Sequence, residues 1–543
     1  MNNAILKFER PKNEPSMNYA PGSPERELVK EAIAQISSEV AEIPLIIGGE
    51  PIYTGDKGNV VMPHDHGHRL AVYHKAGAEQ MELAIRAANE AHESWSCMPW
   101  SERAKISLKI AELIDNKYRY LLNAATMMGQ SKSVWQAEIE SASQTIDYFR
   151  FSVCCMKELY SEQPASEEGA VNMLEYRPLE GFIYAVSPFN FTSLAANLPM
   201  APVLMGNTVV WKPATTSLLS NWYLMKIFME AGVPAGVLNF MPGPGSVGSR
   251  VALNDRNLAG IHFTGSTHVF NTLWKGVADN LGKYVSYPRL VGETGGKDFL
   301  IMHNSADARA VAAALMRGAF EYQGQKCSAT SRAYIPASRW EELKSQLDVM
   351  MPAARTGDPR DFRNFACAVI DEASFDNCMD YINYAKEAPE AEILYGGTGD
   401  KSVGYFVQPT MIRTTNPHFR SMEEEIFGPI LTLYVYDDEK YIETLHLCNE
   451  TSPYALTGSV FAVEREAIRD AEHILRYAAG NFYINDKTTA ASIGRQPFGG
   501  ARASGTNDKA GTKLNLARWV SPRTIKENLM PPRDFTYPYM REE

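Results

Sequence analysis

One apolar run, Phe182-Ile183-Tyr184-Ala185-Val186, indicates the architecture of the chain through the pattern that follows it. Further apolar runs at 208–211, 237–241 and 261–264 alternate with helix candidates at 194–204, 218–231, 247–253 and 269–277. Short buried strands that alternate with helices indicate a parallel sheet with helices on both faces. Such sheets bind ligands beyond the carboxyl ends of their strands. The sequence therefore predicts an α/β fold with a binding site at that edge.

The flanking regions extend this organisation. Residues 77–160 carry apolar side chains at helical spacing and are expected to be mostly helical. After Glu293 a second alternating region begins, with a helix candidate at 308–320 and strand candidates at 331–335 and 430–435. Residues 1–40 are interrupted by four prolines and are expected to form an arm.

Composition narrows the class of protein. A chain of 543 residues is too long for one simple core, so two or three domains are expected. The net charge of -11 argues against broad nucleic-acid binding. The seven cysteines are odd in number and include no CxxC pair, which favours a reducing compartment. No signal peptide or membrane-spanning run is evident, so we expect a cytoplasmic protein without membrane contact, or a mitochondrial matrix protein in a eukaryote.

A cysteine and a glutamate stand out by their neighbours. Cys327 lies in Gly324-Gln325-Lys326-Cys327-Ser328-Ala329, and Glu293 lies in Gly292-Glu293-Thr294-Gly295-Gly296-Lys297. A lone cysteine is usually a small buried hydrophobe, but the polar residues beside Cys327 indicate the wall of a polar site. A thiol can add to a carbonyl, and a carboxylate can activate water to remove the acyl group.

Other motifs are ambiguous when taken singly. Asn190 follows a strand and could donate to an oxyanion, or could simply occupy a turn. Lys212 ends the next strand and could bind a nucleotide or be solvated. Residues 243–248 match GxGxxG, but a tight strand-to-helix turn is the default interpretation. Residues 423–429 begin with an acidic run, and such runs usually form a solvated surface. Residues 64–68 contain three histidines without a zinc-like spacing, and no metal site is expected.

Together these segments resemble the aldehyde dehydrogenase superfamily, in the same chain order. The shared motifs are Pro188–Phe191, Lys212–Ala214, Phe263–Ser266, Glu293–Lys297, Gly324–Cys327, Glu425–Pro429 and Pro497–Gly500. The resemblance covers nearly the whole chain from about residue 45. It implies a Rossmann-type NAD domain, an α/β catalytic domain and a small oligomerisation element.

Longer segments resemble one branch of that superfamily, which oxidises L-glutamate γ-semialdehyde, the open form of 1-pyrroline-5-carboxylate, in proline degradation. They are 128–132, 136–139, 320–329, 479–487 and 499–509. The resemblance implies that Cys327 forms a thiohemiacetal and then a thioester, and that Glu293 activates the water that releases L-glutamate. The Asn190 amide and the Cys327 backbone N–H would hold the oxyanion.

The resemblance also implies a substrate site. Lys326 and Ser328 would face the substrate carboxylate, and the aliphatic chain would pack on two phenylalanines. The remaining substrate candidates are the phenylalanines Phe191 and Phe498, the backbone amides of Ala490 and Ala491, and Glu138 near the entrance. Relatives often carry Gly-Ser where this chain has Ala490-Ala491, so the anchor would rest on backbone N–H groups or on Ser492.

For the cofactor, the resemblance implies that Lys212 and Glu425 bind the two riboses and that Ser266 lies near the pyrophosphate. Pro188 and Phe427 complete the expected NAD site. Thr215 stands where many NAD-preferring relatives have a glutamate that would repel a 2′-phosphate. Threonine would not repel that phosphate, so NADP stays open as a weaker alternative to NAD, the expected cofactor.

The expected division is an arm at 1–40, an NAD-binding domain at 41–161 and 181–293, a catalytic domain at 294–485 and an oligomerisation element at 162–180 and 510–543. The resemblance implies a homodimer or a higher homo-oligomer that acts on a small molecule. Three alternatives stay open at this point: a dehydrogenase for another semialdehyde, a cysteine hydrolase or thioesterase that needs no nucleotide, and a catalytically silent binding protein.

Overall fold

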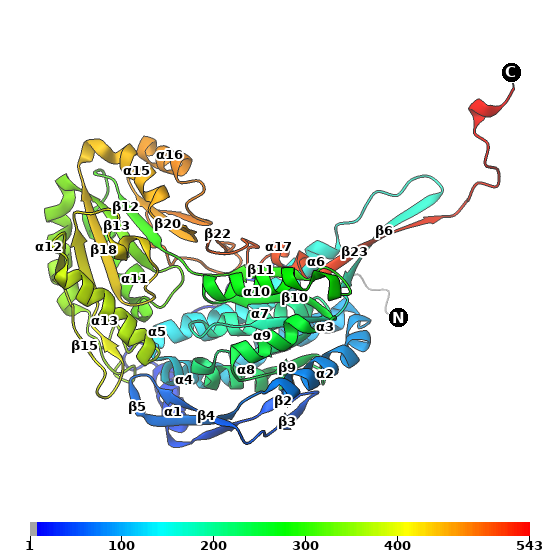
Figure 1. The fold of residues 1–543 in the computed structure, drawn as a ribbon, viewed down its shortest axis with the longest axis horizontal. Helices are drawn as coiled ribbons and strands as arrows, with labels where there is room; N and C mark the ends of the chain where they lie inside the picture. Colours follow the sequence, from blue (N-terminus) through cyan, green and yellow to red (C-terminus); the bar gives the residue numbers. More distant parts are fainter. Residues whose placement is uncertain (1–7, 543) are drawn as a thin grey trace.

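A computed structural model describes residues 8–542 and consists of two sheet-containing units, a helical region and a projecting ribbon (Figure 1). The first sheet has seven strands in the order β11-β10-β7-β8-β9-β2-β3. Its strands are β2 (Leu45–Ile47), β3 (Glu50–Ile52), β7 (Phe182–Val186), β8 (Thr208–Lys212), β9 (Leu238–Phe240), β10 (Leu258–Thr264) and β11 (Arg289–Glu293). The five strands from β11 to β9 are parallel, as predicted, whereas β2 and β3 add an antiparallel edge.

Alternate side chains of this sheet are buried on opposite faces, which explains why the strands are apolar throughout. One face carries Ile183 and Val209 and packs against α7 (Thr192–Leu204) and α8 (Leu218–Ala231). The other face carries Tyr184 and packs against three helices, α2 (Ala78–Ser96), α9 (Gly245–Asn254) and α10 (Thr267–Asp279). The predicted helices on both faces of the sheet are therefore confirmed.

The second sheet forms the unit at the left of Figure 1, in the order β14-β17-β18-β13-β12-β20-β21. All neighbouring pairs are parallel except β14 with β17. Its strands are β12 (Asp298–Met302), β13 (Thr330–Pro336), β14 (Ala391–Tyr395), β17 (Thr410–Thr414), β18 (Ile430–Tyr436), β20 (Thr457–Phe461) and β21 (Asn481–Ile484). The covering helices are α11 (Ala308–Phe320), α12 (Trp340–Ala353), α13 (Glu372–Glu387), α15 (Tyr441–Glu450) and α16 (Arg465–Ile474).

The segment between α2 and β7 is mostly helical, as predicted, and includes α3 (Trp100–Leu113), α4 (Arg119–Gln130) and α6 (Gln144–Tyr160). The expected N-terminal arm differs in part, because it contains the helix α1 (Pro24–Ser38). Pro24 occupies the first turn of this helix, where its missing N–H and fixed φ are tolerated. Residues 1–7 of the expected arm lie outside the described residues.

Three strands form a small separate sheet beside α1. They are β1 (Ala41–Ile43), β4 (Lys57–Met62) and β5 (Asp65–His74), in the order β1-β5-β4. The histidine-rich run 64–68 consists of His64 and the first four residues of β5, and the His64 ring is buried. Its Nε2 lies 4.0 Å from Asp358 Oδ1. Among residues 8–542 no group of three or more His, Cys, Asp or Glu side chains is arranged to hold a metal ion.

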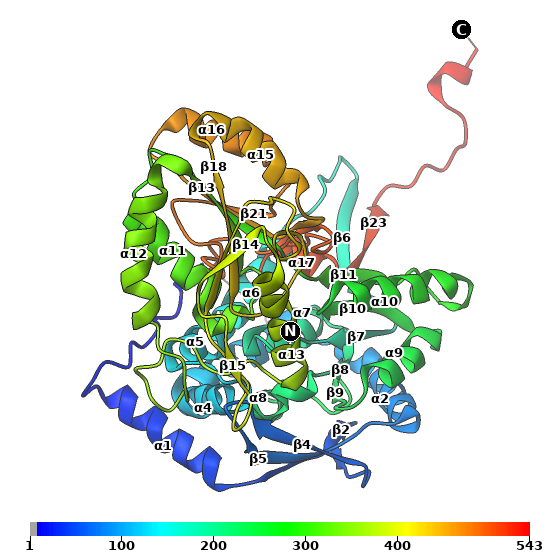
Figure 2. The same ribbon diagram turned by 60° about the vertical axis from the view of Figure 1, so that its left-hand side comes forward.

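A two-stranded antiparallel ribbon projects from the body of the molecule. It pairs β6 (Ala170–Pro178) with β23 (Val520–Asn528), two segments that are far apart in the sequence. The tail after β23 extends away from both sheets (Figures 1 and 2). Leu529, Met530 and Phe535 of this tail are exposed. The assignment of these segments to oligomerisation, like the other domain boundaries, stays a prediction.

Within the part of the chain that the structure describes, no helix is both long enough and apolar enough to cross a bilayer.

Candidate active site

Cys327 lies where two cavities meet. The larger cavity, of about 990 Å³, is bounded mainly by the carboxyl edge of the first sheet and by α9 and α10. The smaller cavity, of about 230 Å³, is bounded by α6, α7 and the segment around residue 490. Cys327 lines both. A single thiol can therefore face two ligands that bind from different sides.

A strained turn presents this cysteine. Tyr322, Gln323 and Gly324 all have positive φ, at 51°, 55° and 66°. Two of them are not glycine, and such conformations persist only where the surroundings hold them. The Gln323 amide donates to the carbonyl oxygens of Ser131 and Ala368, at 3.0 and 2.7 Å. The turn before Cys327 is thus fixed by a buried side chain.

The surroundings of Cys327 favour the neutral thiol. Burial raises the pKa of Cys327 well above its usual value, and the nearby carboxylates of Asp298, Glu293 and Glu425 raise it further. The Ser328 N–H donates to the sulfur and acts in the opposite direction. A proton must therefore be removed before the sulfur can act as a nucleophile.

Asn190 lies close to this turn, in the loop between β7 and α7. Its Nδ2 donates to the carbonyl oxygen of Gln325, at 3.1 Å, and the side chain is buried. An amide nitrogen carries two hydrogens, so one N–H remains for another acceptor. Asn190 also lines the larger cavity together with Cys327. The structure therefore brings together the two residues expected to handle the oxyanion.

Glu293 ends β11 and lines neither cavity in this conformation. Burial raises the pKa of its carboxyl well above the usual value, while the Gly500 N–H and Lys509 lower it. The glycines of the Pro497–Gly500 motif make room for it, because a Cβ at Gly499 would lie 2.9 Å from Glu293 Oε1. Oε2 is buried without a hydrogen-bond partner. A carboxylate in such a site is a stronger base than one in water.

The smaller cavity contains nearly all of the predicted substrate residues. Phe191, Lys326, Ser328, Ala490, Ala491 and Phe498 line it with Cys327. The cavity combines two aromatic walls, a cation, a hydroxyl and a backbone segment. This set is suited to a short aliphatic chain that ends in a carboxylate.

Glu138 does not belong to this wall and corrects the expectation that it lies at the substrate entrance. Its carboxylate is fully buried and accepts from Arg119 Nη2 at 2.6 Å and from the Tyr19 hydroxyl at 2.7 Å. Glu140 lines the cavity instead. A π-helical turn spans Glu138–Ser143, and residues two apart face away from each other on a helix.

Glu140 and Glu321 connect three lysines, of which Lys326 and Lys487 line the smaller cavity. Lys326 Nζ lies 3.1 Å from Glu140 Oε1 and 3.6 Å from Glu321 Oε2. Glu140 also pairs with the buried Lys132, and Glu321 pairs with Lys487 at 2.8 Å. We name these five residues the charge chain. With every member ionised, it carries one more positive than negative charge.

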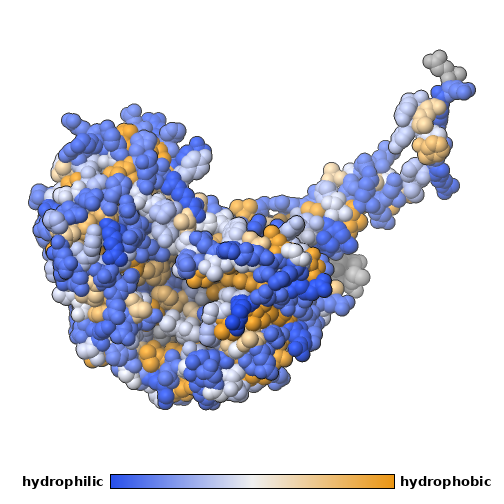
Figure 3. All heavy atoms as spheres, viewed as in Figure 1, coloured by the Kyte–Doolittle hydropathy of each residue, from blue (hydrophilic) through white to orange (hydrophobic). Residues whose placement is uncertain are grey.

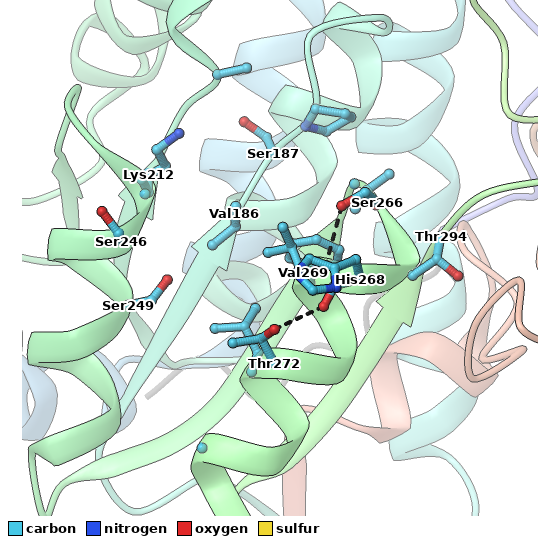
Figure 4. Close-up of a pocket in the computed structure, with 18 of the residues that line it drawn as sticks. Val186, Ser187, Lys212, Ser246, Ser249, Ser266, His268, Val269, Thr272 and Thr294 are labelled. Carbon is cyan, nitrogen blue, oxygen red and sulfur yellow. Dashed lines mark hydrogen bonds between the residues drawn. The ribbon is translucent and has the colours of Figure 1, made fainter. Parts of the chain in front are cut away.

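The larger cavity contains all five predicted cofactor residues, namely Pro188, Lys212, Ser266, Glu425 and Phe427. Figure 4 shows Lys212 and the hydroxyls of Ser246 and Ser249 on one side, with Ser266 and Thr294 on another. Apolar side chains are visible in the recess over α9 and α10 in Figure 3, and Val269 is an exposed apolar residue of α10. Hydroxyls, a lysine, a carboxylate and an apolar wall suit a dinucleotide.

Lys212 and Glu425 have perturbed acidity. Burial lowers the pKa of Lys212 to about 8. Burial raises the pKa of Glu425 to about 7, against the opposing effect of the Gly296 N–H, which it accepts at 2.9 Å. Perturbed groups that line a cavity are candidates for a functional site.

Ser246 and Ser249, which were not predicted from the sequence, lie on α9, which begins within the segment 243–248. A Cβ at Gly243 would lie 2.9 Å from the Ala76 backbone nitrogen, so this glycine permits a tight approach of two chain segments. Gly245 and Ser246 line the cavity, whereas Gly243 does not. The GxGxxG pattern could have indicated these serines, since residues at a helix N-terminus often face phosphate groups.

Comparison with known proteins agrees with this geometry. The sequence profile of the "Aldehyde dehydrogenase family" matches residues 53–525. The "Delta-1-pyrroline-5-carboxylate dehydrogenase, mitochondrial" of Dictyostelium discoideum is 54% identical, with 98% of this chain and 96% of the relative covered. The human protein of the same name is 44% identical, with 97% and 94% covered.

A solved structure is similarly close. The crystal structure of the delta-pyrroline-5-carboxylate dehydrogenase from Mycobacterium tuberculosis bound with NAD has a TM-score of 0.96 and 47% sequence identity, and the whole of both chains is covered. The family profile spans most of the chain, and full-length relatives exceed 40% identity. The chain therefore belongs to the aldehyde dehydrogenase family.

Proposed function

We propose that this protein oxidises L-glutamate γ-semialdehyde, which is the open form of 1-pyrroline-5-carboxylate, to L-glutamate with NAD⁺ as the electron acceptor. The observation that carries the proposal is the smaller cavity, in which Cys327 faces two phenylalanines, Lys326 and Ser328. The names of the relatives, and the NAD bound in the Mycobacterium tuberculosis structure, support it independently.

Substrate recognition follows from the shape and charge of that cavity. The aliphatic part of the substrate packs between Phe191 and Phe498. Its α-carboxylate binds the Ser328 hydroxyl, the Ala490–Ala491 backbone and the Lys326 ammonium. The reactive aldehyde is then at the Cys327 end. A short aldehyde without a carboxylate would lack these contacts.

The reaction begins at Cys327. The Cys327 thiol gives its proton to a solvent water, and the sulfur forms a bond to the aldehyde carbon as the C=O π bond breaks. The carbonyl oxygen becomes an oxyanion that accepts from the free N–H of Asn190. When bound, NAD⁺ accepts a hydride and so supplies the two-electron oxidation. Loss of the C–H electron pair leaves a thioester on Cys327.

Glu293 completes the cycle. Its carboxylate takes a proton from water while the water oxygen attacks the thioester carbon, and the C–S bond breaks to release L-glutamate and the thiol. Because Glu293 lines neither cavity here, its side chain must rotate toward Cys327 for this step. Gly499 lies against this carboxylate without a side chain that would crowd it.

The larger cavity is the proposed site for NAD⁺. Lys212 and Glu425 are placed to bind ribose hydroxyls, and Ser266 and Ser246 to bind the pyrophosphate. Pro188 and Phe427 supply apolar contact near Cys327. Thr215 carries no negative charge, so weak use of NADP⁺ is part of the proposal.

Location and assembly complete the proposal. The Dictyostelium discoideum and human relatives are named mitochondrial, and we propose the matrix as the location if the source is eukaryotic and the cytoplasm otherwise. We also propose a homodimer or a larger homo-oligomer, because the ribbon of β6 and β23 leaves a long edge unpaired.

The test compares two substrates in one assay. NADH formation is measured with 1-pyrroline-5-carboxylate and with butanal at matched concentrations. We expect kcat/KM to be at least about a hundredfold higher for 1-pyrroline-5-carboxylate, since charge-assisted hydrogen bonds discriminate strongly. Equal rates would contradict the substrate assignment and favour another semialdehyde. No NADH from either would contradict the dehydrogenase reaction and favour a hydrolase.

A further inference from the structure

The segment 489–496, which we name the cavity loop, forms one wall of the smaller cavity without belonging to a helix or strand. Ala490, Ala491 and Ile493 line the cavity. The loop makes few bonds to itself: the Ser492 carbonyl accepts from the amides of Arg495 and Gln496. Backbone carbonyls in such a segment need partners from elsewhere if the loop is to keep one position.

Those partners come from the beginning of the chain. Asn13 Nδ2 donates to the carbonyl oxygen of Ile493, at 2.7 Å. Arg10 Nη2 donates to the carbonyl oxygen of Gly494, at 2.7 Å. Arg495 Nε donates back to Asn13 Oδ1, at 2.9 Å. The Asn13 amide thus uses both its donor and its acceptor on the cavity loop.

The arm is also anchored to the helical region, in part through Asn13 itself. Asn13 Nδ2 also donates to Asp147 Oδ2 at 2.7 Å, and the Glu14 N–H donates to Asp147 Oδ1 at 2.8 Å. The Glu14 carboxylate pairs with Arg119 and Arg150, at 2.8 and 2.6 Å. The arm is therefore fixed to α4 and α6, and the position of the loop depends on these helices through the arm.

The opposite side of the loop rests on α6. Ile493 is buried against Tyr148 and Phe151. Gly494 has a φ of 78°, and a Cβ there would lie 2.3 Å from the Phe151 ring. The cavity loop is consequently held between α6 and residues 10–13, and its Ala490 and Ala491 line the same cavity as Cys327.

We propose that Asn13, assisted by Arg10, is a positioning residue that holds the cavity loop where its backbone can bind the substrate carboxylate. This inference rests on the proposed function for the identity of the substrate. Asn13 touches neither the thiol nor the cavity, so it acts through the loop and not on the reacting atoms. Its loss should weaken recognition of the carboxylate while the thiol chemistry continues.

The test uses full-length Asn13→Ala and the matched control Ser16→Ala. Ser16 lies on the same arm, but its hydroxyl bonds to Ser143 and not to the cavity loop. For Asn13→Ala we expect the KM for 1-pyrroline-5-carboxylate to rise about tenfold with kcat changed less than about twofold, as expected when uniform binding is lost. The kcat/KM for butanal should not change. Ser16→Ala should behave as the wild type with both substrates.

Arg10 offers a second test, in which a conservative replacement should restore the KM that an alanine replacement raises. Arg10→Ala should raise the same KM, and Arg10→Lys should restore it, because a lysine can still donate to the Gly494 carbonyl. Hydrogen exchange of peptides covering 487–498 should be faster in Asn13→Ala and unchanged in Ser16→Ala. This readout needs no substrate.

Two results would overturn the inference. One is an equal loss of kcat/KM for both substrates in Asn13→Ala, which would indicate a general defect in folding. The other is unchanged exchange in 487–498 together with an unchanged KM. If the wild type does not prefer 1-pyrroline-5-carboxylate, the proposed function fails, whereas faster exchange in Asn13→Ala would still show that the arm holds the loop.

Discussion

Lys326 Nζ lies 3.1 Å from Glu140 Oε1, so the lysine next to Cys327 in the sequence is paired with a carboxylate from the helical region and not with the sulfur. Two carboxylates and three lysines alternate in this charge chain, which ends in Lys132 and Lys487. The members that line the smaller cavity, Lys326 and Lys487 with Glu140 and Glu321, balance in charge, and the positive excess of the chain comes from the buried Lys132. The thiol itself is surrounded mainly by negative charge.

Replacing Lys326 with methionine should weaken binding of the carboxylate. The change leaves Glu140 and Glu321 with one fewer cation and makes the cavity less positive. We expect the KM for 1-pyrroline-5-carboxylate to rise roughly 10- to 100-fold, the range expected for a hydrogen bond to a charged group. Steady-state NADH formation measures it. The butanal reaction is the internal control, and a parallel loss there would contradict a carboxylate-specific role.

Glu293→Gln should separate the two halves of the reaction. The amide keeps the shape of the side chain but cannot take a proton from water, so the thioester on Cys327 should accumulate. We expect a rapid burst of about one NADH per active site, followed by a steady rate lower by a factor on the order of 10² to 10⁴. Stopped-flow absorbance and intact-protein mass would measure the burst and the acyl adduct. A variant without any burst would place Glu293 before the oxidation and not after it.

Cys327→Ser should abolish NADH formation, because an alcohol in this apolar and acidic setting is a far weaker nucleophile than a thiolate. Cys97→Ser is the control, since Cys97 is exposed and away from both cavities. We expect at least about a thousandfold loss in the first variant and none in the second. Retention of activity in Cys327→Ser would rule out the proposed nucleophile.

Binding of NAD⁺ should depend on the ionisation of Lys212. Burial lowers the pKa of this lysine to about 8, so the cation is lost as the pH rises through 8. If the ammonium donates to a ribose, the Kd for NAD⁺ should increase between about pH 7.5 and pH 9, on either side of that pKa. Equilibrium fluorescence titration measures this Kd without the chemical step at Cys327. In Lys212→Met the Kd should be higher at neutral pH and should lose this pH dependence; a retained dependence would assign it to another group.

Glu138 should contribute to stability and not to catalysis. Burial alone would raise its pKa, but Arg119 and Tyr19 outweigh this and the pKa lies below the usual 4.5. A group whose pKa is lowered by folding stabilises the fold above its unfolded pKa, and that contribution is lost as the pH falls through the folded value. Wild-type Tm should therefore fall more steeply below pH 4.5 than the Tm of Glu138→Gln.

At neutral pH the same Glu138→Gln change should cost about 3 kcal/mol, because it removes a partner of the buried Arg119. The KM for 1-pyrroline-5-carboxylate should not change by more than about twofold, as expected for a group remote from the substrate. A specific rise in KM would restore Glu138 to the substrate site.

The sequence was sufficient to predict the helices and strands whose boundaries are determined by nearby residues. The helix at 218–231 was predicted with the observed ends, and the neighbouring strands to within a few residues, because their apolar periods are regular and glycines or prolines bound them. Cys327, Asn190 and Lys212 stood out by their neighbours or by their place at strand ends, and the other predicted residues of the two cavities came from family motifs. No periodicity indicates that Asn190 and Gln325, which are far apart in the sequence, share a hydrogen bond.

The failures have a physical origin as well. Glu138 and Glu140 both lie in a helical stretch whose residues are buried on almost every side, so hydrophobic pattern could not show which of them faces the cavity. Residues 1–40 were expected to form an arm because four prolines interrupt them. Its partners, the loop beyond residue 490 and the Asp147 carboxylate, are visible only in three dimensions.

The bond between Asn13 and Ile493 joins residues that are 480 positions apart. During synthesis at about 5 to 20 residues per second, roughly 25 to 95 seconds separate the appearance of the two partners. Tyr19 and Glu138, which share a hydrogen bond, are only 119 positions apart. The arm can therefore bind to the helical region early in synthesis, before the cavity loop has been made. The cavity loop, the wall of the smaller cavity that is synthesised last, would then pack against an arm that had left the ribosome long before.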